Sequence, residues 1–273
     1  MKQKLVLERS ALGLGDIKYL LRYRKDYIRP DDPHLDGSHI HDCYEIYINL
    51  SGEVSFFVNN RLFPIKRGDV VFTRSGDIHF CVFDQATVHE YFCLWIGAEE
   101  GSPTAEFIEK NFKENFFSCE KSCDDISELL FKVYEGANNE VSFEETVNLL
   151  QCLLLLSEKR EVDRVAPPSI LPMEIQRIVD DINENFADIR SVADIIERHY
   201  ISQATLNRRF KKYMKVTPRA FLESKKLAYA KLLLSAGASV TDACFRAGFS
   251  DCSHFISVFK RKFGYTPYKY KSK

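Results

Sequence analysis

The sequence predicts a multidomain α+β protein: an N-terminal β-barrel or jelly roll with trailing helices, followed by an all-α C-terminal domain. Three observations lead to this fold class. Residues 1–100 contain many short apolar runs at close spacing, which is typical of small barrels. Between residues 101 and 160 the apolar residues recur at helical spacing instead. After a segment that contains several prolines, the last hundred or so residues contain one helical pattern twice, which indicates an internal repeat.

The composition is that of a globular protein. Hydrophobic residues make up 45% and aromatic residues 13% of the 273 residues, which is enough for two domains with cores of their own. The N-terminal residues MKQKLVLERS do not resemble a signal peptide, and no apolar run is long enough to span a membrane. The eight cysteines are scattered and include no CxxC pair. We therefore expect reduced thiols, a cytoplasmic location and no membrane partner.

The first hundred residues predict a series of short strands joined by tight turns. Ser51-Gly52 and Asn59-Asn60 supply the turn residues of the first hairpins. The expected strands are Tyr44–Leu50, Val54–Val58, Arg61–Ile65, Val70–Thr73, His79–Phe83 and Tyr91–Ile96. Strands of this length and spacing favour a small barrel or a jelly roll.

Two groups of residues in this part have the spacing of known motifs. The first group consists of His39, His41, Glu45 and Gly52, with one, three and six residues between successive members. The second group consists of Gly68, Gly76 and His79. In both motifs the N-terminal domain resembles a cupin, although Arg74 stands in place of the usual proline and Phe83 in place of the usual asparagine.

The cupin resemblance implies a ligand site inside the barrel. In cupins that serve as sensors, the motif residues border a pocket for a small effector, often a sugar, without catalysis. We expect such a pocket here, lined by His39, His41, Glu45, His79, Tyr47 and Trp95, with Tyr44 and Arg61 as further neighbours. This interpretation requires no cofactor. The alternative is a divalent metal bound by His39, His41, Glu45 and His79, because three imidazoles and a carboxylate suit zinc, iron, nickel or manganese.

Residues 101–160 predict a helical segment with three apolar stripes. The stripes contain Phe107, Ile108, Phe112 and Phe116, then Ile126, Leu129, Leu130 and Val133, then Val147, Leu149, Leu150, Leu153, Leu154 and Leu156. Ser142 and Glu145 have the spacing of a capping box before the third stripe. In the sensor domains that this chain resembles, such helices form the dimer contact, so we expect a homodimer. The alternative is that the stripes only cover the barrel. Prolines between residues 161 and 172 indicate a linker there.

The repeated pattern lies in residues 173–273, where two helix-turn-helix motifs are expected at about residues 190–214 and 240–263. In the second, helices at Val240–Arg246 and Asp251–Phe263 flank Gly248, which supplies the left-handed backbone of a sharp turn. Val192, Asp194, Ile201 and Ser202 recur 48 residues later, and Leu206, Phe210, Lys211, Lys212, Thr217 and Pro218 have counterparts 49 residues later. The domain boundaries that we predict are 1–100, 101–160, 161–172 and 173–273.

The C-terminal domain resembles the AraC/XylS family of bacterial transcription regulators. The second motif carries most of the likeness, from Gly248-Phe249-Ser250-Asp251 through Phe259-Lys260-Arg261-Lys262-Phe263-Gly264 to Thr266-Pro267. The resemblance implies promoter or operator DNA as a partner, contact with RNA polymerase, and activation of transcription. A cupin is the common sensor domain of this family.

The second helix of each motif is expected to enter a major groove. The base-contacting positions are Ala204, Asn207 and Arg208 in the first motif and Cys252, Ser253, His254 and Ser257 in the second. Asn207 can pair with adenine and Arg208 with guanine. Because many relatives have arginine in place of Ser257, we expect the first helix to discriminate more strongly. The expected phosphate contacts are Lys211, Lys212, Lys260, Arg261 and Lys262.

The charge is divided between the two halves of the chain. Residues 173–273 hold 19 of the 38 basic and 10 of the 39 acidic residues, a balance of +9. Residues 1–172 hold the other 19 basic and 29 acidic residues, a balance of -10. A basic C-terminal half is what binding to phosphate requires.

We therefore predict a transcription regulator, and not an enzyme, whose small effector changes how two DNA-binding halves are presented. A metal-dependent cupin enzyme fused to a DNA-binding domain is the alternative from another class. A cysteine-based alkyl-transfer repair protein is disfavoured, because Cys43 has no neighbouring cysteine in the sequence to complete a metal site.

Overall fold

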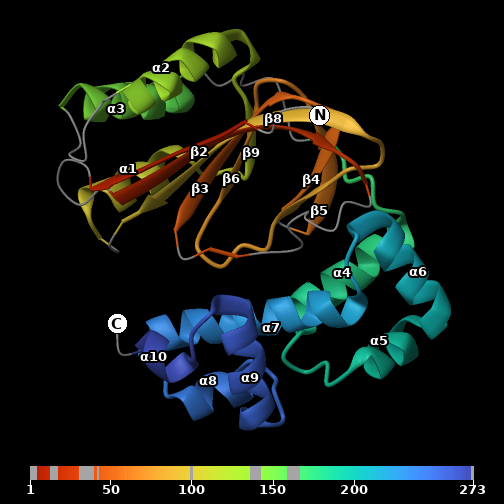
Figure 1. The fold of residues 1–273 in the computed structure, drawn as a ribbon. Helices are drawn as coiled ribbons and strands as arrows, with labels where there is room; N and C mark the ends of the chain where they lie inside the picture. The colour runs from red at the N-terminus through yellow and green to blue at the C-terminus, as the bar shows by residue number, and fades with distance from the viewer. Residues whose placement is uncertain are drawn as a thin grey trace.

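The computed structural model describes residues 5–12, 18–30, 40–41, 43–58, 60–98, 101–135, 143–158 and 167–271. Of the predicted site residues, His39 lies outside these ranges, as does Ser142 of the expected capping box. The N-terminal half forms two antiparallel sheets that face each other, and the C-terminal half is helical (Figure 1). This arrangement confirms the predicted fold class.

The described strands form one larger and one smaller sheet. The larger sheet has the order β1-β2-β8-β3-β6-β9 and the smaller one the order β5-β4-β7. The strands are β1 (Leu5–Leu12), β2 (Lys18–Ile28), β3 (Tyr44–Ser51), β4 (Val54–Val58), β5 (Arg61–Ile65), β6 (Asp69–Thr73), β7 (Phe80–Val82), β8 (Thr87–Gly97) and β9 (Phe116–Ser118). The strand positions predicted for residues 44–96 agree with this result to within a few residues at each end.

Strand alternation separates the two faces of the larger sheet. On β3, Ile46 and Ile48 belong to an outer core that also contains residues of the helices behind the sheet. Tyr47 belongs instead to the core between the sheets, together with Phe56 and Phe63 of the smaller sheet. The residues of β3 that point to the same side as Tyr47 therefore face the interior of the barrel.

Helices cover the outer face of the larger sheet. They are α1 (Pro103–Asn111), α2 (Cys123–Glu135) and α3 (Phe143–Glu158), and a 3-10 turn at Glu120–Ser122 precedes α2. The prediction that Phe116 continues a helical stripe was wrong: α1 ends at Asn111, and Phe116 pairs with Val71 as part of β9. Both arrangements bury the phenylalanines, so apolar spacing alone did not distinguish them.

The C-terminal half contains two helix-turn-helix units that share one long helix. The helices are α4 (Met173–Asn185), α5 (Val192–His199), α6 (Gln203–Met214), α7 (Pro218–Ser235), α8 (Val240–Arg246), α9 (Cys252–Phe263) and α10 (Pro267–Lys271). The long helix α7 begins with a Thr217 cap and a proline in its first turn, a combination that favours helix initiation. It runs from the unit formed by α4, α5 and α6 to the unit formed by α8, α9 and α10 (Figure 1).

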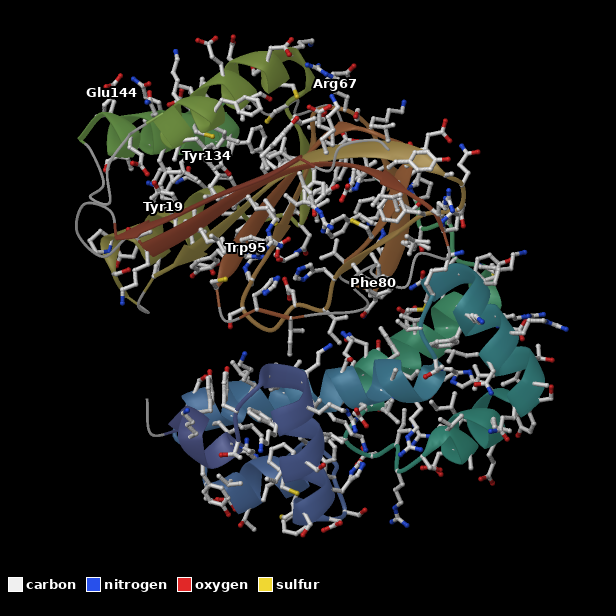
Figure 2. The ribbon with its side chains drawn as sticks, viewed as in Figure 1. Tyr19, Arg67, Phe80, Trp95, Tyr134 and Glu144 are labelled. Carbon is white, nitrogen blue, oxygen red and sulfur yellow. The ribbon has the colours of Figure 1, made fainter. Side chains whose placement is uncertain are left out.

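The smaller sheet packs directly on the first of these units. Phe57 stacks on Phe80 with ring centroids 4.7 Å apart and meets Phe221 of α7 edge-on at 5.8 Å. These rings belong to one apolar cluster that includes α4 and α6. Polar contacts surround it, since the Ile170 amide donates to the Leu62 carbonyl and Gln176 Nε2 donates to the Asn60 carbonyl. Figure 2 shows the Phe80 side chain at this junction.

No helix in the described part of the chain is both long enough and apolar enough to cross a membrane.

Candidate recognition helices and candidate effector site

The first recognition helix, α6, is held by an N-terminal cap and by an ion pair with α4. The Ser202 side chain accepts a hydrogen bond from the Thr205 amide and caps the helix. An ion pair joins Arg209 to Glu174 of α4. Leu206 and Phe210 are fully buried, so the orientation of α6 about its own axis is fixed.

This orientation leaves one face of α6 in solvent. The exposed predicted residues are Ala204, Asn207, Arg208, Lys211 and Lys212. They combine an amide, a guanidinium and two ammonium groups, which are the donor and acceptor types that base edges and phosphates bind. The structure therefore brings all five predicted residues of the first motif onto one exposed face.

The neighbouring helix α5 is anchored by an acidic residue of α4. Asp181 accepts hydrogen bonds from His199 at 2.8 Å and from Arg198 at 3.2 Å. Burial raises the pKa of Asp181, but the hydrogen bond from His199 and the other polar partners outweigh burial and leave this pKa below its ordinary value. The charged carboxylate thus fixes α5 relative to α4.

The second recognition helix, α9, is capped by Asp251, which accepts from the amides of Ser253 and His254. Phe255, Val258 and Phe259 bury its inner face. The exposed predicted residues are Ser253, His254, Ser257, Lys260 and Arg261, whereas Cys252 and Lys262 are half-buried.

Two of the basic residues on α9 are less available than the sequence suggested. Arg261 donates to Glu223 of α7 at 2.8 Å. Burial lowers the pKa of Lys262. With hydroxyls and one imidazole at the remaining positions, α9 offers weaker partners for guanine than α6 does.

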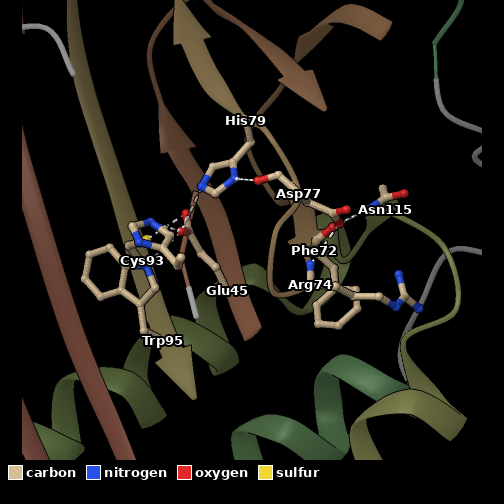
Figure 3. Close-up of polar contacts among 9 residues, drawn as sticks. Glu45, Phe72, Arg74, Asp77, His79, Cys93, Trp95 and Asn115 are labelled. Carbon is tan, nitrogen blue, oxygen red and sulfur yellow. Dashed lines mark hydrogen bonds and ion pairs between the residues drawn. The ribbon is translucent and has the colours of Figure 1, made fainter. Parts of the chain in front are cut away.

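The second candidate site surrounds a buried glutamate between the two sheets. Glu45 is 3% exposed and accepts hydrogen bonds from Trp95 Nε1 at 2.7 Å and from the Cys93 thiol at 3.1 Å. His79 Nε2 lies 3.0 Å and His41 Nε2 2.8 Å from the same oxygen, Oε2, that accepts from Trp95. Figure 3 shows Glu45, His79, Cys93 and Trp95 converging from β3, the loop before β7, and β8.

The charges of this site stabilise one another. Burial raises the pKa of Glu45, but the neighbouring His79 and His41 outweigh it and hold this pKa well below the ordinary value. Burial lowers the pKa of His79, and the charge of Glu45 reverses the shift, so that the pKa is raised. Pairing of the carboxylate with the imidazole offsets the cost of burying either group in its charged form.

The orientation of His79 is fixed by the loop that precedes β7. His79 Nδ1 donates to the Asp77 carbonyl at 2.9 Å. The Asp77 carboxylate in turn accepts from the Arg74 amide at 2.9 Å and from Asn115 at 3.4 Å. Because the Nδ1 proton is committed to a carbonyl, Nε2 is directed at Glu45 (Figure 3).

The donor set fits a divalent transition metal. His41, Glu45 and His79 each offer one donor atom, and these atoms lie within 4.8 Å of one another. A histidine whose Nδ1 donates to a carbonyl presents Nε2 in the manner of metal-bound histidines. Among the described residues, this is the group of His, Cys, Asp and Glu side chains whose donor atoms lie close enough together to hold a metal ion.

Two predicted neighbours of the pocket lie elsewhere. Tyr44 faces the outer side of the larger sheet, where it stacks on Phe72 at 6.0 Å. Arg61 donates to the Pro167 carbonyl at the junction of the two halves. Both predictions were wrong. Tyr44 has the opposite parity to Glu45 on β3, and Arg61 lies on β5, where residues 167–170 contact the barrel.

Tyr47 faces the barrel interior as predicted, but its hydroxyl is occupied. It is hydrogen-bonded to His89 Nε2 at 2.5 Å. Burial lowers the pKa of His89 to about 3, so this imidazole is neutral at ordinary pH.

Three further residues lie around the site and were not among the predicted site residues. Cys93 and His89 face the interior from the same strand as Trp95, and the Arg22 guanidinium lies 4.9 Å from the centroid of the Trp95 ring. A signal for the first two was present, since residues two and six positions before Trp95 share its side of a strand. No signal in the sequence placed Arg22 there, because the pairing of β2 with β8 joins distant segments.

Comparisons with known proteins agree with this two-part organisation. A family model described as an AraC-like ligand binding domain matches residues 27–154, and a helix-turn-helix domain model matches residues 196–273. The HTH-type transcriptional activator RhaS of Escherichia coli O139:H28 is 27% identical over 252 residues, which cover 88% of this chain and 89% of that protein. The activator RhaR of Mannheimia succiniciproducens is 26% identical over 243 residues, which cover 86% and 87%.

Among solved structures, ToxT from Vibrio cholerae O395 aligns over 92% of this chain and 98% of its own, at 14% identity and a TM-score of 0.39. The relatives with matching sequence are transcriptional activators, and they give no support to the interpretation as a cupin enzyme.

Proposed function

This chain belongs to the AraC family of transcription regulators, and from that premise we propose that it activates transcription in response to a small effector bound between its two sheets. It acts on double-stranded promoter DNA in the cytoplasm. We further propose that it works as a homodimer and contacts RNA polymerase.

The exposed face of α6 is the single observation that most supports the DNA-binding part of this proposal. Asn207 and Arg208 lie there beside Lys211 and Lys212, while the apolar side of the same helix is buried. A rigid helix with base-pairing groups beside phosphate-binding groups is suited to a major groove. We assign the same role to Ala204 and, on α9, to Cys252, Ser253, His254 and Ser257, with Lys260, Arg261 and Lys262 at the phosphates.

Selection from a randomised duplex pool by the full-length chain tests this part. We expect enrichment of one sequence with two elements about one helical turn apart, roughly 10 base pairs. The affinity for that sequence should fall steeply as salt rises. A chain that enriches no sequence and shows no salt-sensitive affinity for duplex DNA would contradict the proposal.

The effector is proposed to bind at the Glu45 site. Trp95 and the charged groups around Glu45 offer an aromatic face and fixed hydrogen-bond partners, which suit a sugar or another small polar molecule. His39, His41, His79 and Tyr47 are further proposed members of this pocket. Trp95 is the one tryptophan of the chain, so its fluorescence reports directly on the site.

A panel of monosaccharides, screened by thermal shift and by Trp95 fluorescence, tests the effector assignment. A ligand present at 100 times its dissociation constant adds about 2.7 kcal/mol to the stability of the folded state. We expect at least one sugar to shift both signals in wild type and neither signal in Glu45→Gln. A ligand that shifts the melting temperature without changing Trp95 fluorescence would place the effector elsewhere.

A second candidate ligand for the same site is a divalent metal held by His41, Glu45 and His79, with His39 as a proposed fourth ligand. The three clustered donor atoms favour this candidate. When bound, the ion would act as an electrophile toward an oxygen of the effector. Elemental analysis of protein purified without a histidine tag should find close to one equivalent. Less than about a tenth of an equivalent would exclude a resident metal.

The position of the pocket suggests how its occupancy changes the DNA-binding half. His79 contacts Glu45, and the next residue, Phe80, stacks on Phe57, which meets Phe221 of α7. A ligand that displaces His79 therefore acts on a strand that packs against the helix shared by both DNA-binding units. We propose that this contact transmits the signal, through a shift between two arrangements of the junction.

A further inference from the structure

Lys226 of α7 joins the two helix-turn-helix units by its ammonium group. Its Nζ donates to the Ile189 carbonyl at 2.7 Å and to the Gly248 carbonyl at 2.6 Å. Ile189 lies between α4 and α5, in the first unit, whereas Gly248 lies in the turn between α8 and α9, in the second. One side chain, 5% exposed, therefore bonds the backbones of both units.

The backbones themselves touch at the same place. Gly248 has a φ of +80°, and a Cβ on this residue would lie 2.2 Å from the Ala187 carbonyl oxygen. Ala187 belongs to the connection between α4 and α5 that also contains Ile189. Only a hydrogen atom fits between the turn of the second unit and the connection of the first. The turn that precedes α9 is thus fixed against the first unit from two sides.

The chemistry of Lys226 indicates a positioning role more than a contribution to core packing. Burial lowers its pKa, which shows that the charged ammonium is held in surroundings where it is costly. Its partners are two carbonyls and the ring of Phe249, whose centroid lies 5.8 Å away. A buried apolar residue would fill the same volume without this cost. Only the ammonium group can donate a hydrogen bond to each of the two units at the same time.

The preceding residue provides a natural contrast. Lys225 points in a different direction from α7, and its Nζ contacts the side-chain oxygens of Asn60 in the barrel and Asn183 in α4. Lys225 therefore joins the first DNA-binding unit to the sensor domain, and Lys226 joins the first unit to the second.

We propose that Lys226 is a positioning residue that sets the distance and angle between α6 and α9, so that the protein selects DNA sites by the number of base pairs between their two elements. This inference rests on the proposed DNA-binding function. One added base pair moves the second element by about 3.4 Å and by about a tenth of a turn. A fixed pair of helices cannot follow this movement, whereas a pair that lacks the two hydrogen bonds of Lys226 can follow part of it.

The test uses the duplex selected by the wild-type chain, together with versions that have one base pair added to or removed from the segment between the two elements. Dissociation constants are measured on all three duplexes for wild type and for Lys226→Met, Lys226→Arg and Lys225→Met. The readout is the ratio of dissociation constants within one protein preparation. This ratio does not depend on the folded fraction, so a variant that is merely less stable leaves it unchanged.

Wild type is expected to lose about tenfold in affinity when the spacing changes by one base pair, as for a mismatched site. Lys226→Met should lose no more than about threefold, because the second unit can then adjust. Lys226→Arg retains donors and should recover most of the discrimination. Lys225→Met should match wild type. The inference is overturned if Lys226→Met keeps the wild-type ratio, or if wild type binds all three duplexes equally. A wild-type chain that selects no duplex would instead contradict the proposed function.

Discussion

Arg208 has the clearest individual role among the residues proposed to contact DNA. It is exposed on α6 beside Asn207, and its planar guanidinium can bond both acceptors of guanine in the major groove. We predict that Arg208→Ala weakens binding to the selected site by about 1–3 kcal/mol and relaxes the base preference at one position. Fluorescence anisotropy with singly substituted duplexes measures both effects.

Lys211→Ala is the matched control for Arg208, because Lys211 is exposed on the same helix and is expected to bind phosphate. It should weaken binding to all duplexes about equally and reduce the salt slope by about one. If Arg208→Ala gives this same uniform loss, Arg208 binds phosphate and does not discriminate between bases.

Tyr200 has an unusual backbone for a bulky residue. Its φ is +50° and its side chain is 97% exposed. The equivalent position in the second motif is Gly248, which has a similar conformation. A left-handed backbone costs about 1–2 kcal/mol for a residue with a Cβ, and glycine avoids this cost. The larger entropy of glycine in the unfolded chain offsets part of the resulting stabilisation.

We therefore predict that Tyr200→Gly raises the free energy of unfolding of the first unit by about 0.5–1 kcal/mol. Hydrogen exchange of the α5 and α6 amides measures this locally. Gly248→Ala is the control of opposite sign, because a Cβ there overlaps Ala187 and also requires a positive φ. A loss of protection in Tyr200→Gly would show that the exposed ring makes stabilising contacts.

At the scale of elements, α7 has a different partner on each of its sides. Phe221 packs against the sensor domain, Lys225 bonds Asn60 and Asn183, and Lys226 bonds the second DNA-binding unit. This is why α7 contains buried residues along most of its length. A helix with apolar residues on all sides is expected inside a molecule, not on its surface.

Lys225 makes the junction sensitive to pH. Burial lowers its pKa to about 8 from 10.5, although the charge of Asp77 opposes this shift. The unfolded chain therefore binds more protons than the folded chain between these two values, and the free energy of unfolding should rise with pH from about 8 to about 10.5. Below pH 8 the full cost of the buried charge is present in the folded state.

Thermal melting of wild type and Lys225→Met across pH 7 to 10.5 checks this prediction. We expect the melting temperature of wild type to rise relative to that of Lys225→Met as the pH increases. Lys226 contributes a shift of the same sign, but it is present in both proteins and cancels in the difference. Parallel profiles for the two proteins would show that Lys225 keeps an ordinary pKa.

At the scale of the whole molecule, the sensor domain and the DNA-binding half share one apolar cluster. Phe57, Phe80 and Phe221 lie in this cluster together with residues of α4 and α6. The halves are therefore in continuous packing contact, and a change at the barrel must be accommodated at α7.

We predict that Phe221→Leu separates effector binding from the DNA response. The smaller side chain leaves the Glu45 site intact but removes the edge-on ring contact with Phe57. A sugar identified by the screen should still change Trp95 fluorescence, while its effect on DNA affinity should fall by about half or more. Leu150→Ala, a change at an exposed position of α3, is the control and should keep the full response. An unchanged response in Phe221→Leu would contradict transmission through this contact.

The sequence predicted the elements well where the spacing of apolar residues agreed with the turn and capping residues. The second helix-turn-helix motif is the clearest example, because Gly248 and Asp251 mark the turn and the cap, and the structure has α8 and α9 on either side of them. Phe116 shows the limit. Its spacing from Phe112 suits a helix, but pairing with Val71, about 45 positions earlier, makes it a strand residue. Contacts between distant segments have no local signature.

The candidate site likewise contains residues with a signal in the sequence and residues placed only by contacts between distant segments. Glu45 and His79 were recognisable from motif spacing, and strand alternation was enough to place Tyr47 in the barrel and to expose the error for Tyr44. Arg22 entered the site only through the pairing of β2 with β8.

By itself, the sequence determined the fold class and the two recognition helices, because the patterns that predict them lie within short stretches of the chain. Glu45 and His79, which are 34 positions apart, were found from the spacing of two separate motifs. Only the tertiary structure decided that α7 is bonded on one side to the barrel through Lys225 and on the other to the second unit through Lys226. The physical reason is that a lysine in a helix carries no local information about its partner. The partner is chosen by which backbone carbonyls and side-chain oxygens the packed core brings within about 3 Å.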